Sequence, residues 1–259
     1  MAQKSIQSLR EQVANSEKRF LEGPRSRMRE FLFAFKVFKE FIHAFRKLHF
    51  IGPSVTVFGS ARFKEDHPYY IKARQLGAEI SKLGFTVITG GGPGIMEAAN
   101  RGAYEAGGQS IGCNIILPHE QRENPYVHES VEFNYFFIRK TLLLKYSYAF
   151  IIMPGGWGTM DEMFEALTLI QTGKIKQFPV ILIGTSYWKN LIELTEDMIE
   201  NKTISSEEIK EHLLFTDSVE DAILHLRKFA IEKYGLKKMR RMKAKKWLGE
   251  FPFFRKKVI

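Results

Sequence analysis

A carboxylate, a threonine and a run of glycines stand together in AFIIMPGGWGTMDEMFEALTLIQTG, the segment from Ala149 to Gly173. Its first five residues have the length and content of a buried strand, and the glycines after Pro154 end that strand. Thr159 is predicted to cap a helix whose third residue is Glu162. A glycine turn between a strand and a helix N-terminus directs free N–H groups and the positive helix end at one spot, which suits a phosphate. Glu162 would place a carboxylate beside that anion.

A second turn of the same design lies upstream, where GGGPG occupies residues 90–94 between a strand at 85–89 and a helix from Ile95. The turn at 90–94 does not match the dinucleotide fingerprint, because the last required glycine falls on Ile95, and neither turn has the Gly-Lys-Ser/Thr of a Walker A loop. The sequence therefore disfavours NAD and ATP chemistry. It predicts that the 90–94 turn and the 154–159 turn hold one phosphate between them.

The elements that would position these turns alternate between strands and helices. Strands are predicted at 54–58, 85–89, 110–117, 149–153, 180–184 and 213–216, and helices at 68–83, 95–106, 134–148, 160–170, 188–200 and 218–234. This alternation predicts an α/β fold with a doubly wound parallel sheet, covered by helices on both faces and Rossmann-like in design. Right-handed crossovers would bring the glycine turns to the carboxyl edge of the sheet, where such folds bind ligands.

Two extensions flank this predicted domain of residues 51–235. Residues 1–50 are expected to be helical, with Phe31, Phe35, Phe38, Ile42 and Phe45 at helical spacing among basic residues. Such a stripe is expected to pack on its own domain or across a dimer, with a membrane surface or another partner as the alternative. Residues 236–259 form a basic, aromatic tail. Contact of this tail with nucleic acid or membrane is the alternative to a solvated tail.

Composition narrows the class of protein. The tail holds ten of the 39 Lys and Arg but one of the 29 acidic residues, so it carries +9 of the net charge of +10. The single cysteine, Cys113, excludes an internal disulfide framework and is expected to be buried and inert. The histidines show no metal-ligand spacing, so no metal and no cofactor are expected. The chain has no apolar run of membrane-spanning length and no signal peptide, which indicates a cytoplasmic protein.

Three segments resemble the LOG ("lonely guy") family of nucleoside 5′-monophosphate phosphoribohydrolases, which is often mislabelled lysine decarboxylase. They are GGGPGIMEAANRGAYEAGG, FFIRKTLLLKYSYAF and PGGWGTMDEMFEALTLIQTG, within about half of the chain from Val55 to Gly184. The resemblance implies cleavage of AMP or cytokinin ribotides to free base and ribose 5-phosphate. It also implies at least a homodimer with its active sites near the subunit interface.

The resemblance implies that Arg139 and Glu162 are the catalytic pair, and that the glycine turns and Thr159 bind the phosphate. Cleavage of an N-glycosidic bond passes through an oxocarbenium-like sugar, which Glu162 would stabilise while it orients or deprotonates water. Arg139 would clamp the phosphate or steady the departing base. The predicted substrate-binding residues are Gly59, Ser60, Arg62, Gly91, Gly92, Gly94, Glu97, Lys140, Gly155, Gly156, Gly158 and Thr159.

The sequence leaves alternatives to this interpretation. Phe-Phe-Ile-Arg-Lys at 136–140 replaces the Met-His-Glu-Arg-Lys of many family members, so the chain is similar to the longer bacterial branch and its base specificity is open. Glu97 would bond ribose hydroxyls or be a solvated helix residue, and Arg62 would bind phosphate or lie on the surface. Arg139 and Glu162 would alternatively form a structural ion pair. The whole chain would alternatively be a non-catalytic carrier of a nucleotide or of molybdenum cofactor.

Overall fold

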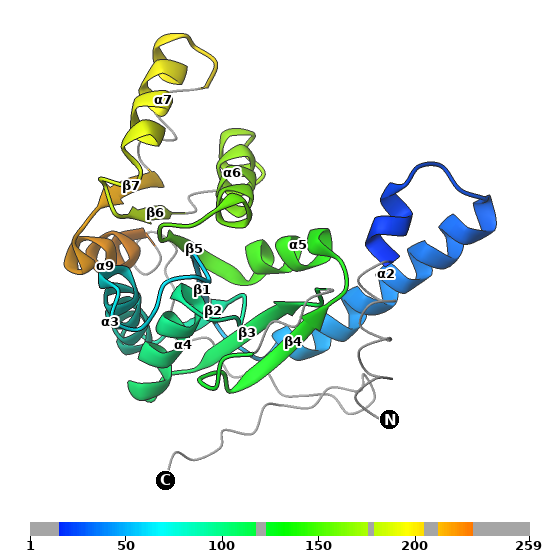
Figure 1. Ribbon diagram of the computed structural model, residues 1–259, viewed down its shortest axis with the longest axis horizontal. Helices are drawn as coiled ribbons and strands as arrows, with labels where there is room; N and C mark the ends of the chain where they lie inside the picture. The colour runs from blue at the N-terminus through cyan, green and yellow to red at the C-terminus, as the bar shows by residue number, and fades with distance from the viewer. Residues whose placement is uncertain (1–15, 118–122, 176–178, 205–211, 230–259) are drawn as a thin grey trace.

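The computed structural model describes residues 16–117, 123–175, 179–204 and 212–229 (Figure 1). Within these residues seven parallel strands form one sheet in the order β4-β3-β2-β1-β5-β6-β7. The strands are β1 (Ser54–Phe58), β2 (Thr86–Thr89), β3 (Ser110–Ile115), β4 (Glu129–Phe133), β5 (Ser147–Ile152), β6 (Val180–Ile183) and β7 (Leu213–Thr216). The predicted α/β fold with a doubly wound parallel sheet is confirmed. The tail at 236–259 lies outside the described residues.

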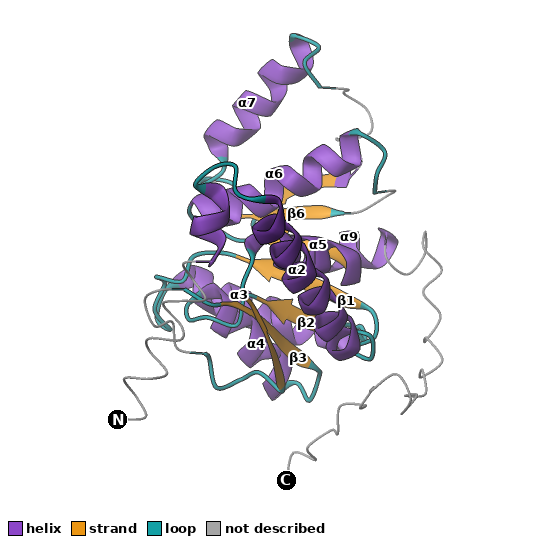
Figure 2. Ribbon diagram, turned by 90° about the vertical axis from the view of Figure 1, so that its right-hand side faces the viewer, coloured by secondary structure: helices purple, strands orange, loops and turns teal. Residues whose placement is uncertain are grey.

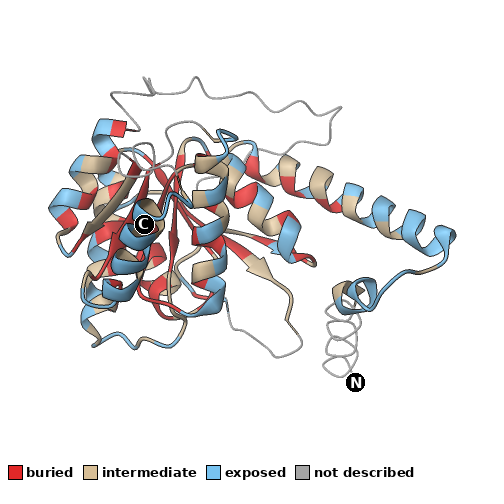
Figure 3. Ribbon diagram, turned by 90° about the horizontal axis from the view of Figure 1, so that it is seen from above, coloured by how far each residue is buried: buried red, intermediate tan, exposed pale blue. Residues whose placement is uncertain are grey.

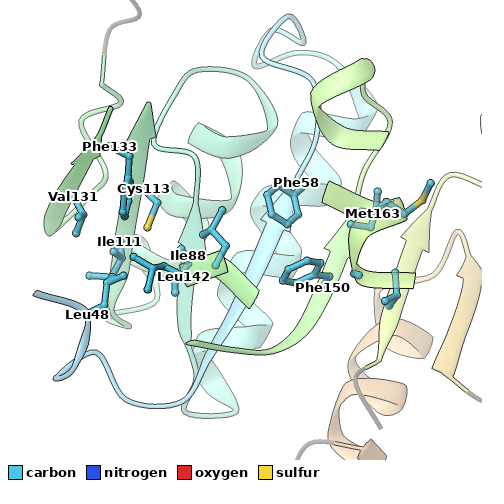
Figure 4. Close-up of a cluster of buried hydrophobic side chains, with 14 of the residues drawn as sticks. Leu48, Phe58, Ile88, Ile111, Cys113, Val131, Phe133, Leu142, Phe150 and Met163 are labelled. Carbon is cyan, nitrogen blue, oxygen red and sulfur yellow. The ribbon is translucent and has the colours of Figure 1, made fainter. Parts of the chain in front are cut away.

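Helices cover both faces of this sheet (Figure 2). The helices are α2 (Arg27–Leu48), α3 (Pro68–Lys82), α4 (Ile95–Glu105), α5 (Phe136–Tyr146), α6 (Trp157–Gln171), α7 (Lys189–Glu200) and α9 (Val219–Arg227). One core lies between the sheet and α2, α5 and α6, with Phe58, Phe150, Leu142 and Met163 among its buried side chains (Figure 4). A second core lies between the opposite face and α3, α4 and α9. The residues of β1, β2 and β6 are buried on both faces of the sheet, as is typical of the inner strands of a parallel sheet.

The direction of winding changes between β1 and β5. From β1 the chain proceeds through β2 to β3 and β4 on one side, and it then returns by α5 to place β5 against the other side of β1. In doubly wound sheets, ligands bind outside the carboxyl ends of the strands at such a switch point. The turns at 59–62 and 154–159, which follow β1 and β5, both lie at this point.

Three details of the predicted elements are wrong. No strand was predicted at β4, because Glu129 and Glu132 interrupt its apolar residues, and this edge strand is only partly buried. The helix predicted at 134–148 ends at Tyr146, and Ser147 already pairs with β1. The helix α6 begins at Trp157, two residues before Thr159, because the Gly156 carbonyl accepts from the amides of Thr159 and Met160 at 3.0 and 3.1 Å.

Other expectations about single segments are confirmed. Ser218 caps α9 by accepting from the Asp221 amide at 3.0 Å. Cys113 is buried, and this burial raises the pKa of its thiol to about 12, so the thiol is inert at neutral pH. Among the helices of the described residues, none combines the length and the hydropathy that a bilayer-crossing segment needs.

Candidate active site

Three turns meet at the carboxyl ends of β1, β2 and β5, and Ser60 connects them. The Ser60 amide donates to the Pro154 carbonyl, and the Ser60 carbonyl accepts from the Ile95 amide, each at 3.0 Å. Gly94, with a φ of 69°, lies so close to Ser60 that a Cβ would overlap the Ser60 carbonyl oxygen. The sequence therefore needs glycine at position 94 for both its backbone conformation and this close contact.

The turn at 154–159 has one packed glycine and two open ones. A Cβ on Gly155 would overlap the Thr159 hydroxyl and lie 3.1 Å from the Ser60 amide, whereas at Gly156 and Gly158 a Cβ would meet nothing within 4 Å. Gly155 thus holds the turn against its neighbours, and Gly156 and Gly158 leave backbone open to a ligand. The buried Thr159 is part of this packing rather than the helix cap that the sequence indicated.

Arg139 and Glu162 lie together at this edge of the sheet, as the sequence predicts for the catalytic pair. Arg139 is in the first turn of α5 and Glu162 in the second turn of α6, and Nη2 of Arg139 lies 3.3 Å from Oε1 of Glu162. The two side chains are 13% and 3% exposed. Nη1 of Arg139 is 4.0 Å from the position that a Cβ on Gly90 would take. The pair therefore borders the 90–94 turn.

This ion pair is incompletely satisfied. Oε2 of Glu162 and Nε of Arg139 are buried, and neither has a hydrogen-bond partner among the residues that the structure describes. Burial raises the pKa of Glu162 to about 7, although the positive charges of Arg139 and Lys140 pull it down. Buried carboxyl groups with a raised pKa and an unpartnered oxygen are concentrated at functional sites, which makes Glu162 a candidate for such a role.

Three of the predicted binding residues have partners within the protein. Lys140 forms ion pairs with Asp161 and Glu165, both at 2.9 Å. Glu97 is partly buried and accepts a hydrogen bond of 2.9 Å from the hydroxyl group of Tyr70. Arg62 is exposed, and its amide donates to the Ser60 hydroxyl at 3.1 Å. Contacts of these side chains with a substrate stay predictions.

Sequence reasoning missed a buried polar network behind the 90–94 turn. Asn124 lies in the loop before β4. Its main-chain amide donates to the Gly91 carbonyl at 2.9 Å, and its side-chain Nδ2 donates to the Gly92 carbonyl at 3.1 Å. Its Nδ2 also lies 3.1 Å from Oδ1 of Asn100, which accepts in addition from the Thr89 hydroxyl at 2.5 Å. The network fixes the shape of the glycine turn. A buried asparagine in a loop has no periodicity that would reveal it in the sequence.

Tyr187 and Asn114 were also missed. The Tyr187 hydroxyl donates to the Gly155 carbonyl at 2.7 Å and so supports the 154–159 turn from the loop after β6. Asn114, near the end of β3, contacts Gly91, and its Oδ1 is buried without a partner within the described part of the chain. Across that same part, no three His, Cys, Asp or Glu side chains gather as metal ligands do.

Known proteins resemble this chain in sequence. A family model described as possible lysine decarboxylase matches residues 96–226, which is half of the chain. Cytokinin riboside 5′-monophosphate phosphoribohydrolase LOG of Oryza sativa subsp. japonica is 27% identical over 177 residues, which cover 67% of this chain and 72% of that protein. The relatives thus support hydrolase activity of this class at the level of the family.

Solved structures extend the comparison to the fold. The X-ray structure of TM1055 superposes with a TM-score of 0.53 at 28% identity and covers 68% of this chain and 99% of that one. The molybdenum cofactor binding protein from the phototrophic bacterium Rippkaea orientalis gives a TM-score of 0.50 at 26% identity, with coverage of 68% and 94%. With its glycine turns, its Arg139–Glu162 pair and the match of the family model, the chain belongs to the LOG family.

Proposed function

We propose that this protein hydrolyses the N-glycosidic bond of nucleoside 5′-monophosphates, AMP or cytokinin ribotides, to free base and ribose 5-phosphate. The observation that carries the proposal is the buried Arg139–Glu162 pair beside the glycine turns. The relatives named as phosphoribohydrolases support it.

The phosphate would bind at the 154–159 turn. The Gly156 carbonyl accepts from the Thr159 and Met160 amides, so the N–H groups that α6 would offer to an anion are those of Trp157 and Gly158, and the positive end of the helix dipole favours the negative charge. Gly156 and Gly158 leave room for close approach, and Ser60 joins this turn to the 90–94 turn. The ribose would then extend toward the Arg139–Glu162 pair.

Glu162 would act on the anomeric carbon. The bond from this carbon to the base nitrogen breaks with its electron pair going to the base, a water oxygen forms the new bond to carbon, and the base takes up the proton that the water loses, so that it leaves neutral. The ionised carboxylate stabilises the positive charge that develops on the sugar and takes a proton from water through Oε2, the oxygen that Arg139 does not bind. Arg139 holds the other oxygen and so fixes the carboxylate in place.

Base release by chromatography tests the proposal. The full chain would be incubated with AMP and with isopentenyladenosine monophosphate, alongside Glu162→Gln and the matched control Glu165→Gln, whose carboxylate lies one turn further along α6. We expect release by the wild type and by Glu165→Gln, and a loss of at least 100-fold in Glu162→Gln, the scale of an essential acid–base group. Equal turnover by Glu162→Gln would reject the assignment.

A second function of a different class is the binding of a nucleotide or a molybdenum cofactor without catalysis. The similarity to the Rippkaea orientalis protein, which is named as a molybdenum cofactor binding protein, favours it. A carrier has no need of a buried carboxylate with a pKa near 7, so the Glu162 environment favours the hydrolase. Tight binding across a panel of 5′-monophosphates without base release would support the carrier.

We also propose that the protein is a homodimer whose interface covers the N-terminal ends of α5 and α6. Four aromatic side chains of these two helices are exposed: Phe136 (41% exposed), Phe137 (40%), Trp157 (88%) and Phe164 (43%). Exposed aromatic clusters are typical of interfaces. Light scattering should show a dimer that Trp157→Ser with Phe164→Ser weakens and that Ile71→Ser, on α3, leaves intact. A monomeric wild type would contradict the proposal.

A further inference from the structure

The helix α2 has apolar side chains on two opposite faces. One face packs on the domain through Phe33, Val37, Phe41, Ala44, Phe45 and Leu48. The other face is exposed. Its side chains are Met28 (67% exposed), Phe31 (68%), Leu32 (52%), Phe35 (49%) and Phe38 (59%). At 100° per residue these five positions share one arc of the helix, roughly opposite Phe33, Val37, Phe41, Ala44 and Leu48, whereas Phe45 points within about 20° of Phe38 and packs because it lies nearer the C-terminal end of the helix. Phe31, Phe35 and Phe38, which the sequence expected to pack on the domain or across a dimer, do not pack on the domain.

This exposed face lies where α2 leaves the domain. In Figure 3 the C-terminal half of α2 carries buried residues over the sheet, and its N-terminal half extends beyond the other helices with mostly exposed residues. The described part of the chain contains nothing that covers Met28, Phe31, Phe35 or Phe38. Large apolar side chains gathered on one exposed face mark an interaction surface.

Basic side chains border the exposed face. Arg27, Arg29, Lys36 and Lys39 lie in the stretch of the helix from residue 27 to 39, and Lys39 Nζ is 4.7 Å from the centre of the Phe35 ring. The one acidic residue of this stretch, Glu30, accepts a hydrogen bond from the Arg25 amide at 3.2 Å. An apolar stripe flanked by cations is the pattern of helices that lie in the interface of an anionic bilayer.

A basic cavity of about 1120 Å³ adjoins this face, between the helical residues 16–21, α2 and the ends of β3 and β4. Its lining includes five Lys and Arg against three acids, Arg19, Arg25, Arg29, Lys36 and Lys39 against Glu30, Glu40 and Glu132. Two oxygens of Glu40 already accept from Asn134. The cavity therefore presents a net positive charge next to the apolar face, as a site for an anionic headgroup would.

We propose that the N-terminal half of α2 docks on an anionic lipid surface, with Met28, Phe31, Leu32, Phe35 and Phe38 inserted at the headgroup level and lipid phosphates bound by the flanking cations. The positive charge around the exposed face favours an anionic bilayer over a second copy of the chain as the occupant. A twofold contact through the same face would bring two sets of Arg27, Arg29, Lys36 and Lys39 together, whereas an anionic bilayer neutralises them.

Vesicle co-sedimentation tests the proposal on the full chain, with its basic tail present in every variant. Vesicles of phosphatidylcholine with phosphatidylglycerol would be compared with vesicles of phosphatidylcholine alone. The test variants are Phe31→Ser with Phe35→Ser and Phe38→Ser, and, separately, Arg29→Gln with Lys36→Gln. The control is Ile71→Ser with Leu224→Ser, which removes exposed apolar side chains from α3 and α9.

We expect binding to the anionic vesicles, a loss of at least tenfold in affinity in both test variants and less than twofold in the control. Raised salt should weaken the wild type, because the cations supply part of the attraction. Thermal unfolding confirms that the substituted chains fold. Failure of the wild type to bind, or undiminished binding by the triple variant, would overturn the proposal. A triple variant that dissociates a wild-type oligomer in light scattering would instead assign this face to a second copy.

Discussion

The buried carboxyl group of Glu162 should make the folded protein less stable as pH rises. Its pKa is about 7 in the folded protein against an ordinary value of 4.5. Between these pH values the folded chain binds a proton that the unfolded chain has lost, so the free energy of unfolding decreases with pH. The contribution is fully present below pH 4.5 and lost above pH 7. At about 1.4 kcal/mol per pKa unit, the change across this window is about 3 kcal/mol.

Glu162→Gln removes this titration and keeps the shape of the side chain. Urea unfolding of both proteins at pH 5 and pH 8 gives the difference in unfolding free energy at each pH. We expect that the variant gains about 3 kcal/mol relative to the wild type between the two pH values. The attraction between Arg139 and ionised Glu162 is already included in the pKa of Glu162, so only those effects of the substitution that do not depend on ionisation cancel in this comparison.

A difference between wild type and Glu162→Gln that does not vary with pH would refute the reasoning. It would mean that Arg139 keeps Glu162 ionised throughout the range, at an ordinary or lowered pKa. A difference that grows in the opposite direction would refute it as well, because attraction to Arg139 and Lys140 would then exceed the effect of burial.

Three further predictions follow from the site. The kcat/KM for AMP should rise with pH through about 7 as Glu162 ionises, and a profile that is flat from pH 5 to pH 9 would contradict its role. Gly155→Ala should raise the KM for AMP at least tenfold, because its Cβ would overlap Thr159 and crowd Ser60. A Cβ on Gly158 would meet nothing within 4 Å, so Gly158→Ala should keep the wild-type Tm. Asn124→Ala should lower the free energy of unfolding by about 1–3 kcal/mol in urea titration, since it leaves the Gly92 carbonyl without the donor Nδ2, while the main-chain amide still donates to the Gly91 carbonyl. An unchanged midpoint would show that the network does not hold the turn.

The sequence was sufficient to predict the sheet because its strands are short apolar runs and its turns are rich in glycine. It was not sufficient for β4, where the buried Val131 and Phe133 alternate with charged residues at the sheet edge. The start of α6 was misplaced for a different reason. A threonine three residues before a glutamate is a common cap, but the Gly156 carbonyl starts the helix earlier.

The proximity of Arg139 and Glu162 could be predicted from their places in the fold, since α5 and α6 flank β5 at one edge of the sheet. Their electrostatic state could not. The pKa of Glu162 depends on the side chains that exclude water around it, and no local pattern encodes that exclusion. The support that Asn124 and Tyr187 give to the glycine turns likewise arises from contacts between distant segments.

The two faces of α2 show a limit of periodicity. Helical spacing identified one stripe of apolar residues at 31, 35, 38, 42 and 45, but it could not tell which part of the stripe packs on the domain. Phe45 packs, while Phe31, Phe35 and Phe38 are exposed, because the helix is longer than the sheet that it covers. Which part of the stripe is covered depends on tertiary structure.

Base release from AMP tests the phosphoribohydrolase activity most directly. The wild-type chain should yield adenine and ribose 5-phosphate in equal amounts. Glu162→Gln should bind AMP without releasing adenine, and Glu165→Gln should retain release. Adenine release by Glu162→Gln at the wild-type rate, or nucleotide binding by the wild type without release from any 5′-monophosphate, would contradict the account.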